Sequence, residues 1–387
     1  MSMSKIKIAD FAEVITGGTP STSNPEYWEN GDVPWLQSGA CQNDVITGCD
    51  TFITQKGLEN SAAKMMKPDS VLIALTGATT GKVGYLTFEA CANQSVTGIQ
   101  PNERFVSKYL FYYLRGIRKK ILDDSYGGAQ KHISQGYVKN IEVPLGSIEE
   151  QKTITKLLES VDTTIALRQQ ELQLLDDLIK ARFVEMFGDP VNNEKNWTTK
   201  PLLSMGSCKN GMNFHYDDSG VEINCLGVGD FKDYSIIADT AALPTVSLNE
   251  MPSPDYLLRD DDIVFVRSNG NKKMVGRSVA VYPGAIPTTF SGFCIRYRRE
   301  DDSVITPYLL RVLKAESMRQ KMYGRGANIQ NLNQQTLSSL DIPVPPKAMQ
   351  EQFATFVAQV DKSKVVVQKA LDEAQILFDS LMQQYFG

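Results

Sequence analysis

Two long stretches with the same apolar spacing decide the architecture of this chain, SIEEQKTITKLLESVDTTIALRQQELQLLDDLIKARFVEMFG (147–188) and PKAMQEQFATFVAQVDKSKVVVQKALDEAQILFDSLMQQYFG (346–387). Their apolar residues recur at alternating intervals of three and four, the spacing of a coiled-coil seam. Neither stretch has an internal proline or glycine, and a proline-marked boundary precedes each. Each stretch therefore predicts one long helix.

The predicted seam consists of large apolar side chains that would pack between the two helices. Its main members are Ile154, Leu158, Val161 and Leu172 in the first stretch and Phe353, Val357, Val360 and Leu371 in the second. One basic residue interrupts each seam, Arg168 in the first and Lys364 in the second. Such residues either fix the register of a helix pair or extend their charge to solvent, and both alternatives stay open.

The two stretches belong to an internal repeat. A shift of 199 residues aligns 133–188 with 332–387 without a gap and gives ten identities in 56 positions, where composition alone would give about three. Upstream, DSVLIALTGATTGKVG (69–84) aligns with DDIVFVRSNGNKKMVG (261–276), and GGAQKHIS (127–134) lies near GRGANIQNLN (324–333). The chain therefore alternates a globular domain with a long helix, twice.

This order predicts an α+β protein with a pseudo-two-fold repeat. We expect a first domain of mixed α/β structure at 1–146, a helical spacer at 147–188, a second domain at 189–346 and a second spacer at 347–387. If the second helix returns along the first, the two form an antiparallel bridge of roughly 60 Å. The alternative is that each helix packs on its own domain.

The charge is unevenly distributed. The chain has a net charge of −5, but residues 64–139 carry 11 lysines and arginines against 5 acidic residues, and residues 263–335 carry 12 against 4. A DNA backbone responds to such local patches, since charges are screened within about 10 Å. Two basic domains on an acidic frame indicate a nucleic-acid partner, although solvated charge without a partner is the simpler alternative.

Several phrases resemble the specificity subunits of type I restriction-modification systems. They are GGTPSTSNPEYWENGDVPWLQSGA (17–40), LIALTGATTGKVGYL (72–86), GGAQKHIS (127–134), VPLGSIEEQKTI (143–154) and IPVPPKAMQEQFATFVAQVDKSK (342–364). The resemblance covers both halves. It departs from the family at Gly146-Ser147, where the second copy has Pro345-Pro346.

The resemblance implies two target-recognition domains on two antiparallel coiled-coil spacers. It implies that the chain binds double-stranded DNA at a bipartite, asymmetric target and assembles with two methyltransferase subunits and with restriction (translocase) subunits. Those partners would carry out adenine-N6 methylation and ATP-dependent restriction with S-adenosylmethionine, ATP and Mg²⁺. This chain would bind no cofactor, and the specificity component of a type IIB or IIG-like enzyme remains an alternative.

Polar and basic residues on glycine-rich turns after apolar strands are the candidate DNA contacts. Their side chains suit phosphates or base edges, although the same residues can simply shape turns. In the first domain they are Thr76, Thr79, Thr80, Lys82, Gln130, Lys131 and His132. In the second they are Arg267, Ser268, Asn271, Lys272, Lys273, Arg325, Asn328, Gln330 and Asn331. The residues that select bases are also expected in less motif-like segments such as 41–62 or 209–250.

No catalytic motif is complete. Residues 77–83 (GATTGKV) resemble a P-loop but have one residue too few between the glycines and a valine in place of the hydroxyl. Asn24-Pro25-Glu26-Tyr27 resembles a methyltransferase signature but lacks its second proline, and Asp260–Asp262 is better explained as a turn. We therefore expect a non-catalytic chain, against the alternatives of a self-contained adenine methyltransferase and a non-DNA-binding coiled-coil scaffold.

Six scattered cysteines and two histidines show no metal-ligand spacing, so reduced thiols and no metal are expected. The sequence has no long apolar run and its start shows no targeting signature, which indicates a cytoplasmic protein with no membrane partner.

Overall fold

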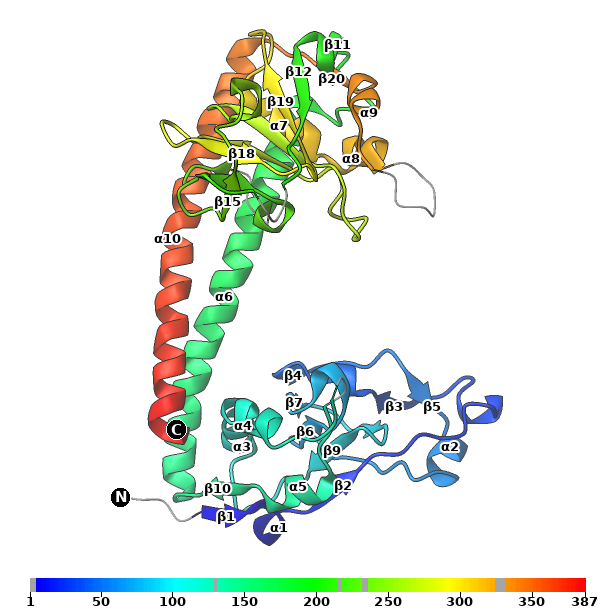
Figure 1. The fold of residues 1–387 in the computed structure, drawn as a ribbon. Helices are drawn as coiled ribbons and strands as arrows, with labels where there is room; N and C mark the ends of the chain where they lie inside the picture. Colours follow the sequence, from blue (N-terminus) through cyan, green and yellow to red (C-terminus); the bar gives the residue numbers. More distant parts are fainter. Residues whose placement is uncertain (1–4, 129–130, 215–217, 232–235, 324–330) are drawn as a thin grey trace. The chain divides into compact units, whose positions relative to one another are not determined.

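The two halves of the chain fold into two domains of the same topology. The computed structural model describes residues 5–128, 131–214, 218–231, 236–323 and 331–387. Two compact units divide it, one made of Met1–Gln170 with Gln368–Gly387 and the other of Glu171–Val367. We call them unit 1 and unit 2, and the sheet-containing part of each is domain 1 or domain 2 (Figure 1).

The described residues of domain 1 form three sheets. The five-stranded sheet has the order β2-β9-β6-β7-β4 (Val14–Thr16, Val96–Ile99, Val71–Ala74, Val83–Leu86 and Asp44–Ile46). The three-stranded sheet has the order β5-β3-β8 (Phe52–Ile53, Val33–Leu36 and Cys91–Ala92), and β1 (Lys5–Lys7) pairs with β10 (Glu142–Pro144).

Domain 2 repeats each of these sheets. Its five-stranded sheet has the order β12-β19-β16-β17-β14 (Gly206–Asn210, Cys294–Arg299, Asp262–Val266, Ser278–Val281 and Ile236–Ile237). Its three-stranded sheet has the order β15-β13-β18 (Thr245–Leu248, Val221–Leu226 and Thr288–Phe290), and β11 (Thr199–Pro201) pairs with β20 (Asp341–Pro343). Parallel and antiparallel pairings also correspond, for β7 and β4 run parallel as do β17 and β14.

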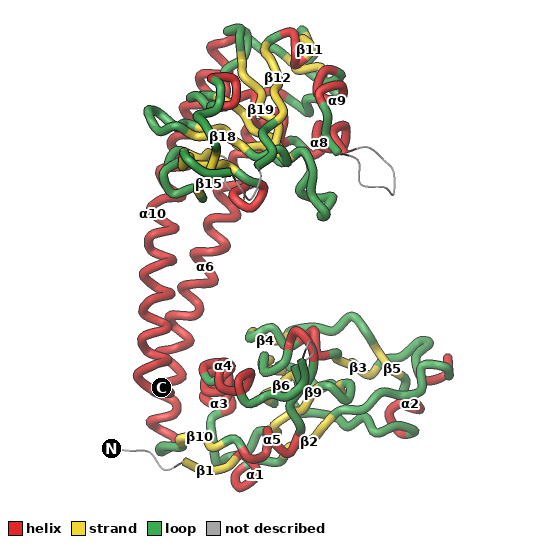
Figure 2. The backbone as a smooth tube through the Cα atoms, in the orientation of Figure 1, coloured by secondary structure: helices red, strands yellow, loops and turns green. Residues whose placement is uncertain are grey.

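Three of the short helices correspond as well. Domain 1 has α1 (Ile8–Phe11), α2 (Gln55–Glu59), α3 (Ser107–Gly116), α4 (Arg118–Asp123) and α5 (Gln135–Asn140). Domain 2 has α7 (Thr306–Lys314), α8 (Glu316–Tyr323) and α9 (Gln334–Ser338), which lie 199 or close to 199 residues after α3, α4 and α5. Figure 2 shows how much of each domain is loop between these elements.

The central strand of each domain explains the layering. Val71 and Ile73 of β6 face a core shared with α3 and the long helices, whereas Leu72 and Ala74 face the three-stranded sheet. Side chains alternate along a strand, and a strand covered on both faces is apolar throughout. In β16, Ile263 and Phe265 likewise face the helices while Val264 and Val266 face the other sheet.

The two long stretches are helices, α6 (Ile148–Phe187) and α10 (Lys347–Phe386). In unit 1, Ile154, Leu158 and Val161 of α6 share a core with Ala374 and Phe378 of α10 and with α3. In unit 2, Phe353 and Val360 of α10 pack with Ile179 and Phe183 of α6 and with α7. Within each unit the helices run in opposite directions, and the predicted seam packs on the partner helix and on the domain at once. Packing of each long helix on the domain of its own unit is therefore observed, and a bridge between the two domains stays a prediction.

The remaining seam residues are less buried. Leu172, Val357 and Leu371 are only half-buried. Lys364, which interrupts the seam of α10, pairs with Asp176 of α6 at 2.8 Å within unit 2. The ion pair with Asp176 favours the alternative in which Lys364 fixes the register of the helix pair. Arg168, the corresponding interruption in α6, is half-buried.

One buried glutamine in each unit attaches a long helix to its domain. Gln151 accepts a hydrogen bond from the backbone N–H of Val106 at 2.8 Å and donates one to the Gly146 carbonyl at 2.9 Å. Gln350, 199 residues later, accepts from the N–H of Ile305 at 2.9 Å and donates to the carbonyls of Ser303 and Pro345. The repeat thus reproduces individual hydrogen bonds, and both side chains are almost fully buried.

Candidate nucleic-acid interface

The candidate loop of domain 1 follows β6 and is held together by its own threonines. The Thr80 side chain is fully buried, and its hydroxyl bonds to the carbonyls of Gly77 at 2.8 Å and Lys131 at 2.9 Å. Thr79 is half-buried and bonds to the Thr76 carbonyl at 3.4 Å. The hydroxyl of Thr80 therefore shapes the turn, as the simpler interpretation of these residues has it.

Basic and aromatic side chains lie at the accessible part of this loop. Lys131 is exposed, and Lys82 donates a hydrogen bond to Gln42 at 2.6 Å. The His132 ring lies edge-on to the Tyr126 ring, with centroids 4.9 Å apart, and Tyr126 is 60% exposed. The structure therefore brings the segments around 76–82 and 131–132 together, because Ile133 donates its N–H to the Leu75 carbonyl. Gln130 lies outside the described residues.

Domain 2 places the equivalent segments in the same way. Leu332 donates its N–H to the Arg267 carbonyl at 2.9 Å, matching the bond between Ile133 and Leu75. Arg267 also donates from its guanidinium to the Gly292 carbonyl at 3.2 Å. Ser268 is half-buried, while Asn271, Lys273 and Asn331 are exposed and Lys272 is half-buried. Arg325, Asn328 and Gln330 lie outside the described residues.

The gap-free alignment of the two loops is wrong. In domain 1 the loop between β6 and β7 spans 75–82, whereas in domain 2 the loop between β16 and β17 spans 267–277 and is three residues longer. Gly81 and Gly276, with φ of 73° and 76°, each donate an N–H to the last residue of the preceding strand. Both positions need the left-handed conformation that glycine tolerates. Lys82 therefore corresponds to Arg277, a residue that is not among the predicted DNA contacts.

The basic excess of residues 263–335 is partly internal. Arg298 of β19 forms a bidentate ion pair with the buried Asp262, at 2.7 and 2.8 Å. Arg296 is only 4% exposed, and burial lowers the pKa of its guanidinium. The excess of twelve basic over four acidic residues thus overstates the charge that this domain presents to a partner.

The catalytic look-alikes are turns. Asn24 caps the 3₁₀ turn Pro25–Tyr27 by accepting a hydrogen bond from the Glu26 N–H. Gly77–Thr79 is also a 3₁₀ turn. Asp262 closes the turn that begins at Arg259, accepting its N–H at 2.8 Å, and Asp261 accepts a hydrogen bond from Tyr282.

The six cysteines are free thiols, and Cys41, Cys91, Cys225 and Cys294 are buried. Burial raises the pKa of Cys41 to about 12 and so disfavours a thiolate. Within the described ranges, no group of three or more His, Cys, Asp or Glu side chains is placed to hold a metal ion. No helix among the described residues is both long and apolar enough to cross a membrane.

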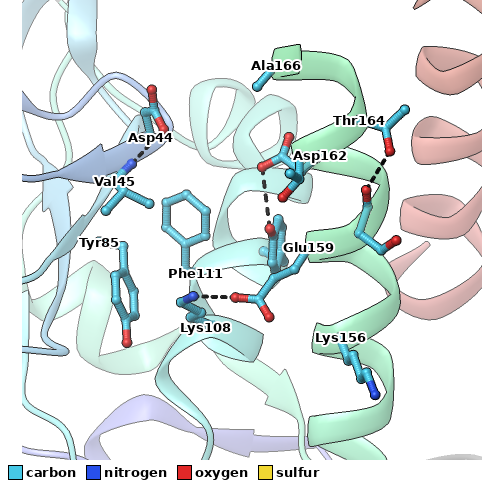
Figure 3. A pocket seen from close by; sticks show the side chains of 13 residues that line it. Asp44, Val45, Tyr85, Lys108, Phe111, Lys156, Glu159, Asp162, Thr164 and Ala166 are labelled. Carbon is cyan, nitrogen blue, oxygen red and sulfur yellow. Dashed lines mark hydrogen bonds and ion pairs between the residues drawn. The ribbon is translucent and has the colours of Figure 1, made fainter. Parts of the chain in front are cut away.

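A pocket in unit 1 lies between β4, α3 and the first half of α6 (Figure 3). Lys108 of α3 pairs with Glu159 of α6, and Arg115 pairs with Asp162 of α6 at 3.0 Å. Tyr85 also lines the pocket; its hydroxyl donates a hydrogen bond to Asp69, and burial raises the pKa of this tyrosine. These ion pairs hold the domain against its helix, which gives the pocket's charged walls a structural explanation.

The fold and its loops define a class of protein, a two-domain chain whose duplicated α/β domains present basic loops and are each attached to long helices. A family model described as "Type I restriction modification DNA specificity domain" matches residues 2–176 and 244–374. These ranges include most of the chain and part of each half. The chain therefore belongs to this family and is a non-catalytic specificity subunit of the type I kind.

Relatives cover nearly the full chain. The StySPI specificity subunit of Salmonella potsdam is 25% identical over 92% of this chain and 81% of its own length. The MjaIX specificity subunit of Methanocaldococcus jannaschii is 23% identical over 97% of this chain and 90% of its own. The sequence resemblance is thus confirmed in both halves.

Solved structures share the fold. The S subunit of a type I restriction-modification system from M. genitalium aligns with a TM-score of 0.58 at 14% identity, over 100% of this chain and 96% of its own. A chain from a structure titled for complex assembly and conformational transition of the type I R-M system aligns with a TM-score of 0.60 at 16% identity, over 100% and 97%.

Proposed function

We propose that this chain reads a bipartite, asymmetric DNA target, with one half-site bound by each domain. The observation that carries the proposal is the duplicated frame. Both domains have the same strand order, yet equivalent loops carry different side chains, such as Lys82 against Arg277 and Thr79 against Met274. Two similar domains with different loops suit two different half-sites, because base-edge contacts differ with sequence while phosphate contacts do not.

The same proposal assigns the chemistry to partner subunits. Two methyltransferase subunits and the restriction subunits would carry out adenine-N6 methylation and ATP-dependent restriction, with S-adenosylmethionine, ATP and Mg²⁺ bound by those partners and none by this chain. Large apolar side chains that are exposed on both long helices support a protein partner. They include Leu167, Leu174 and Leu178 on α6 and Val365, Val366, Ile376 and Leu377 on α10.

The two helices, as antiparallel coiled-coil spacers, would set the unread gap between the half-sites. Determining the methylated motif in cells that express this chain with its methyltransferase partner tests the proposal directly. We expect two short, different half-sites separated by a fixed number of unread base pairs. A single continuous motif would contradict the two-domain reading.

Salt dependence separates a DNA-binding subunit from a scaffold. The affinity of the complex for its target is expected to fall with salt, with a logarithmic slope of about −0.9 for each phosphate contacted. Replacing both Lys272 and Lys273 with alanine should weaken binding to all sequences and make this slope shallower. The control Lys195→Ala changes an exposed lysine far from the loops in sequence and should leave the slope unchanged. Binding that does not depend on salt would favour the scaffold.

A further inference from the structure

An exposed aromatic ring stands beside the candidate loop of domain 2. Phe293 is 61% exposed, in the turn between β18 and β19, whereas Phe231, Phe265 and Phe290 of the same domain are fully or almost fully buried. Full burial of a phenylalanine side chain is favourable by about 1.5–3 kcal/mol. The exposed ring of Phe293 is therefore available to a partner that would cover it.

The backbone of this turn is held firmly against the loop. The Phe293 carbonyl accepts hydrogen bonds from the N–H groups of Arg267 at 2.8 Å and Ser268 at 3.3 Å. The Arg267 guanidinium bonds to the Gly292 carbonyl, and the Phe293 N–H bonds to the Ser291 hydroxyl at 3.3 Å. The backbone of Phe293 is thus hydrogen-bonded to the loop that contains Arg267, Lys272 and Lys273.

Domain 1 has a different side chain at the same position of the frame. Strand register matches Ala74 and Val96 of domain 1 with Val266 and Cys294 of domain 2, so Ser95 corresponds to Phe293. The Ser95 carbonyl accepts the Leu75 N–H at 2.8 Å, and the Ser95 N–H bonds to the Asn93 side chain at 3.0 Å. The same turn, with two equivalent hydrogen bonds, therefore presents a hydroxyl in one domain and a ring in the other.

We propose that Phe293 is a specificity-determining residue whose ring contacts the C5-methyl group of a thymine in the half-site read by domain 2. This inference rests on the proposed function. Cations on the adjoining loop can hold phosphates without selecting a sequence, whereas an apolar ring has one apolar partner on the edges of the major groove, the thymine methyl. An exposed position whose side chain differs between two turns of equivalent backbone is where two readers of different half-sites would differ.

The test uses the complex of this chain with its methyltransferase partner and a duplex that carries the methylated motif. Each thymine of the domain 2 half-site is replaced in turn by uracil, which removes only the methyl group. For the wild-type complex we expect one position at which uracil weakens binding by about tenfold, within the range for loss of a base contact. Phe293→Ala should bind the thymine duplex about tenfold more weakly and should no longer distinguish uracil there.

Two variants make the result specific. Phe293→Leu keeps an apolar side chain and should retain part of the discrimination between thymine and uracil. Ser95→Ala, the matched change in domain 1, should leave the discrimination at the domain 2 half-site unaltered. Thermal unfolding of Phe293→Ala should match the wild type, because the ring contributes little buried surface.

The outcomes separate the inference from the proposed function. A wild-type complex with no sequence-specific binding contradicts the proposed function itself. A specific complex in which no uracil replacement matters, or in which Phe293→Ala discriminates as the wild type does, overturns this inference alone. Uniform weakening of specific and non-specific DNA by Phe293→Ala also overturns it, since it would indicate a backbone contact, and unchanged DNA binding with a lost methyltransferase subunit would assign the ring to a protein partner instead.

Discussion

The junctions between the two domains and their long helices use the same positions but different side chains. In unit 1, Arg115 of α3 pairs with Asp162 of α6 at 3.0 Å and lies 4.8 Å from the centre of the Phe378 ring. In unit 2 the repeat places Lys314 and Asp361 at the positions of Arg115 and Asp162.

The unit 2 junction carries more charge. Lys364 and Asp176, which pair with each other, stand where unit 1 has Ile165 and Gln375. Burial, and then the nearby Arg311, lower the pKa of Lys314 to about 7. The pKa of Asp361 is raised, mainly by burial. The same junction therefore accepts either two ion pairs with an aromatic ring beside one of them or a cluster of partly buried charges, while the buried Gln151 and Gln350 make equivalent hydrogen bonds in both units.

The largest expected difference between the units lies in their apolar contacts. Phe353 of α10 is fully buried and meets the rings of Phe183 and Phe187 at 5.5 and 5.6 Å, while its counterpart in unit 1 is Ile154. Phe353→Ala should reduce the free energy of unfolding by about 3–5 kcal/mol, more than Ile154→Ala, because it leaves the larger cavity. Urea unfolding of both variants measures this. Equal losses would mean that the two junctions pack alike.

Replacement of the buried glutamines Gln350 and Gln151 should cause the next largest loss of stability. Gln350→Leu leaves the Ile305 N–H and the carbonyls of Ser303 and Pro345 without their partner, and we expect it to cost about 2–4 kcal/mol. Gln151→Leu breaks fewer such bonds and should cost less. The same unfolding measurement applies, with Gln359→Leu on the exposed surface of α10 as a control expected to be nearly neutral. A larger loss for Gln151 would show that the shared anchor is used more strongly in unit 1.

The charge cluster should give unit 2 a distinctive pH dependence. Lys314 in the folded chain has a pKa of about 7, below its usual range in an unfolded chain. At a pH between the pKa of Lys314 in the folded chain and that of a lysine in the unfolded chain, the unfolded state binds more protons. The free energy of unfolding therefore rises with pH in this range and decreases as the pH falls towards 7. In Lys314→Met, the increase in the free energy of unfolding between pH 7 and pH 9.5 should be smaller than in the wild type by about 1–2 kcal/mol.

The matched variant in unit 1 provides the contrast. Arg115→Met should destabilise the protein by a similar amount at pH 7 and 9.5, because arginine stays charged throughout and its ion pair with Asp162 is lost at both. Thermal unfolding across this pH range distinguishes the two. A Lys314→Met variant with the wild-type pH profile would show that Lys314 is ordinarily protonated in the folded chain.

The smallest effect is expected for the ion pair between the helices. Lys364→Ile and Asp176→Gln introduce the side chains found at the equivalent positions of unit 1. A double-mutant cycle should give a coupling free energy of about 0.5–1 kcal/mol, because both partners are partly exposed. Assembly with the methyltransferase partner should be unchanged if the pair only adds stability. Loss of assembly in the double variant would instead support a role in helix register.

Much of the fold could be predicted from the sequence. Helix periodicity and the 199-residue repeat predicted α6, α10 and two similar domains, because these features depend on local spacing and on duplicated sequence. The candidate loops were also found from their position after apolar strands. Their detailed correspondence was not, since a three-residue insertion within 267–277 has no signature in composition and appears only through strand register.

By itself, the sequence determined the repeated order of domain and helix, the apolar seams, the absence of a complete catalytic motif and the family. Tertiary structure alone decided that the Thr80 side chain is buried, that Arg296 is buried and Arg298 pairs with the buried Asp262, and that Phe293 is exposed on the turn where domain 1 has Ser95. The physical reason is that spacing along one chain fixes local periodicity, whereas burial and partner choice depend on which distant strands and turns come together.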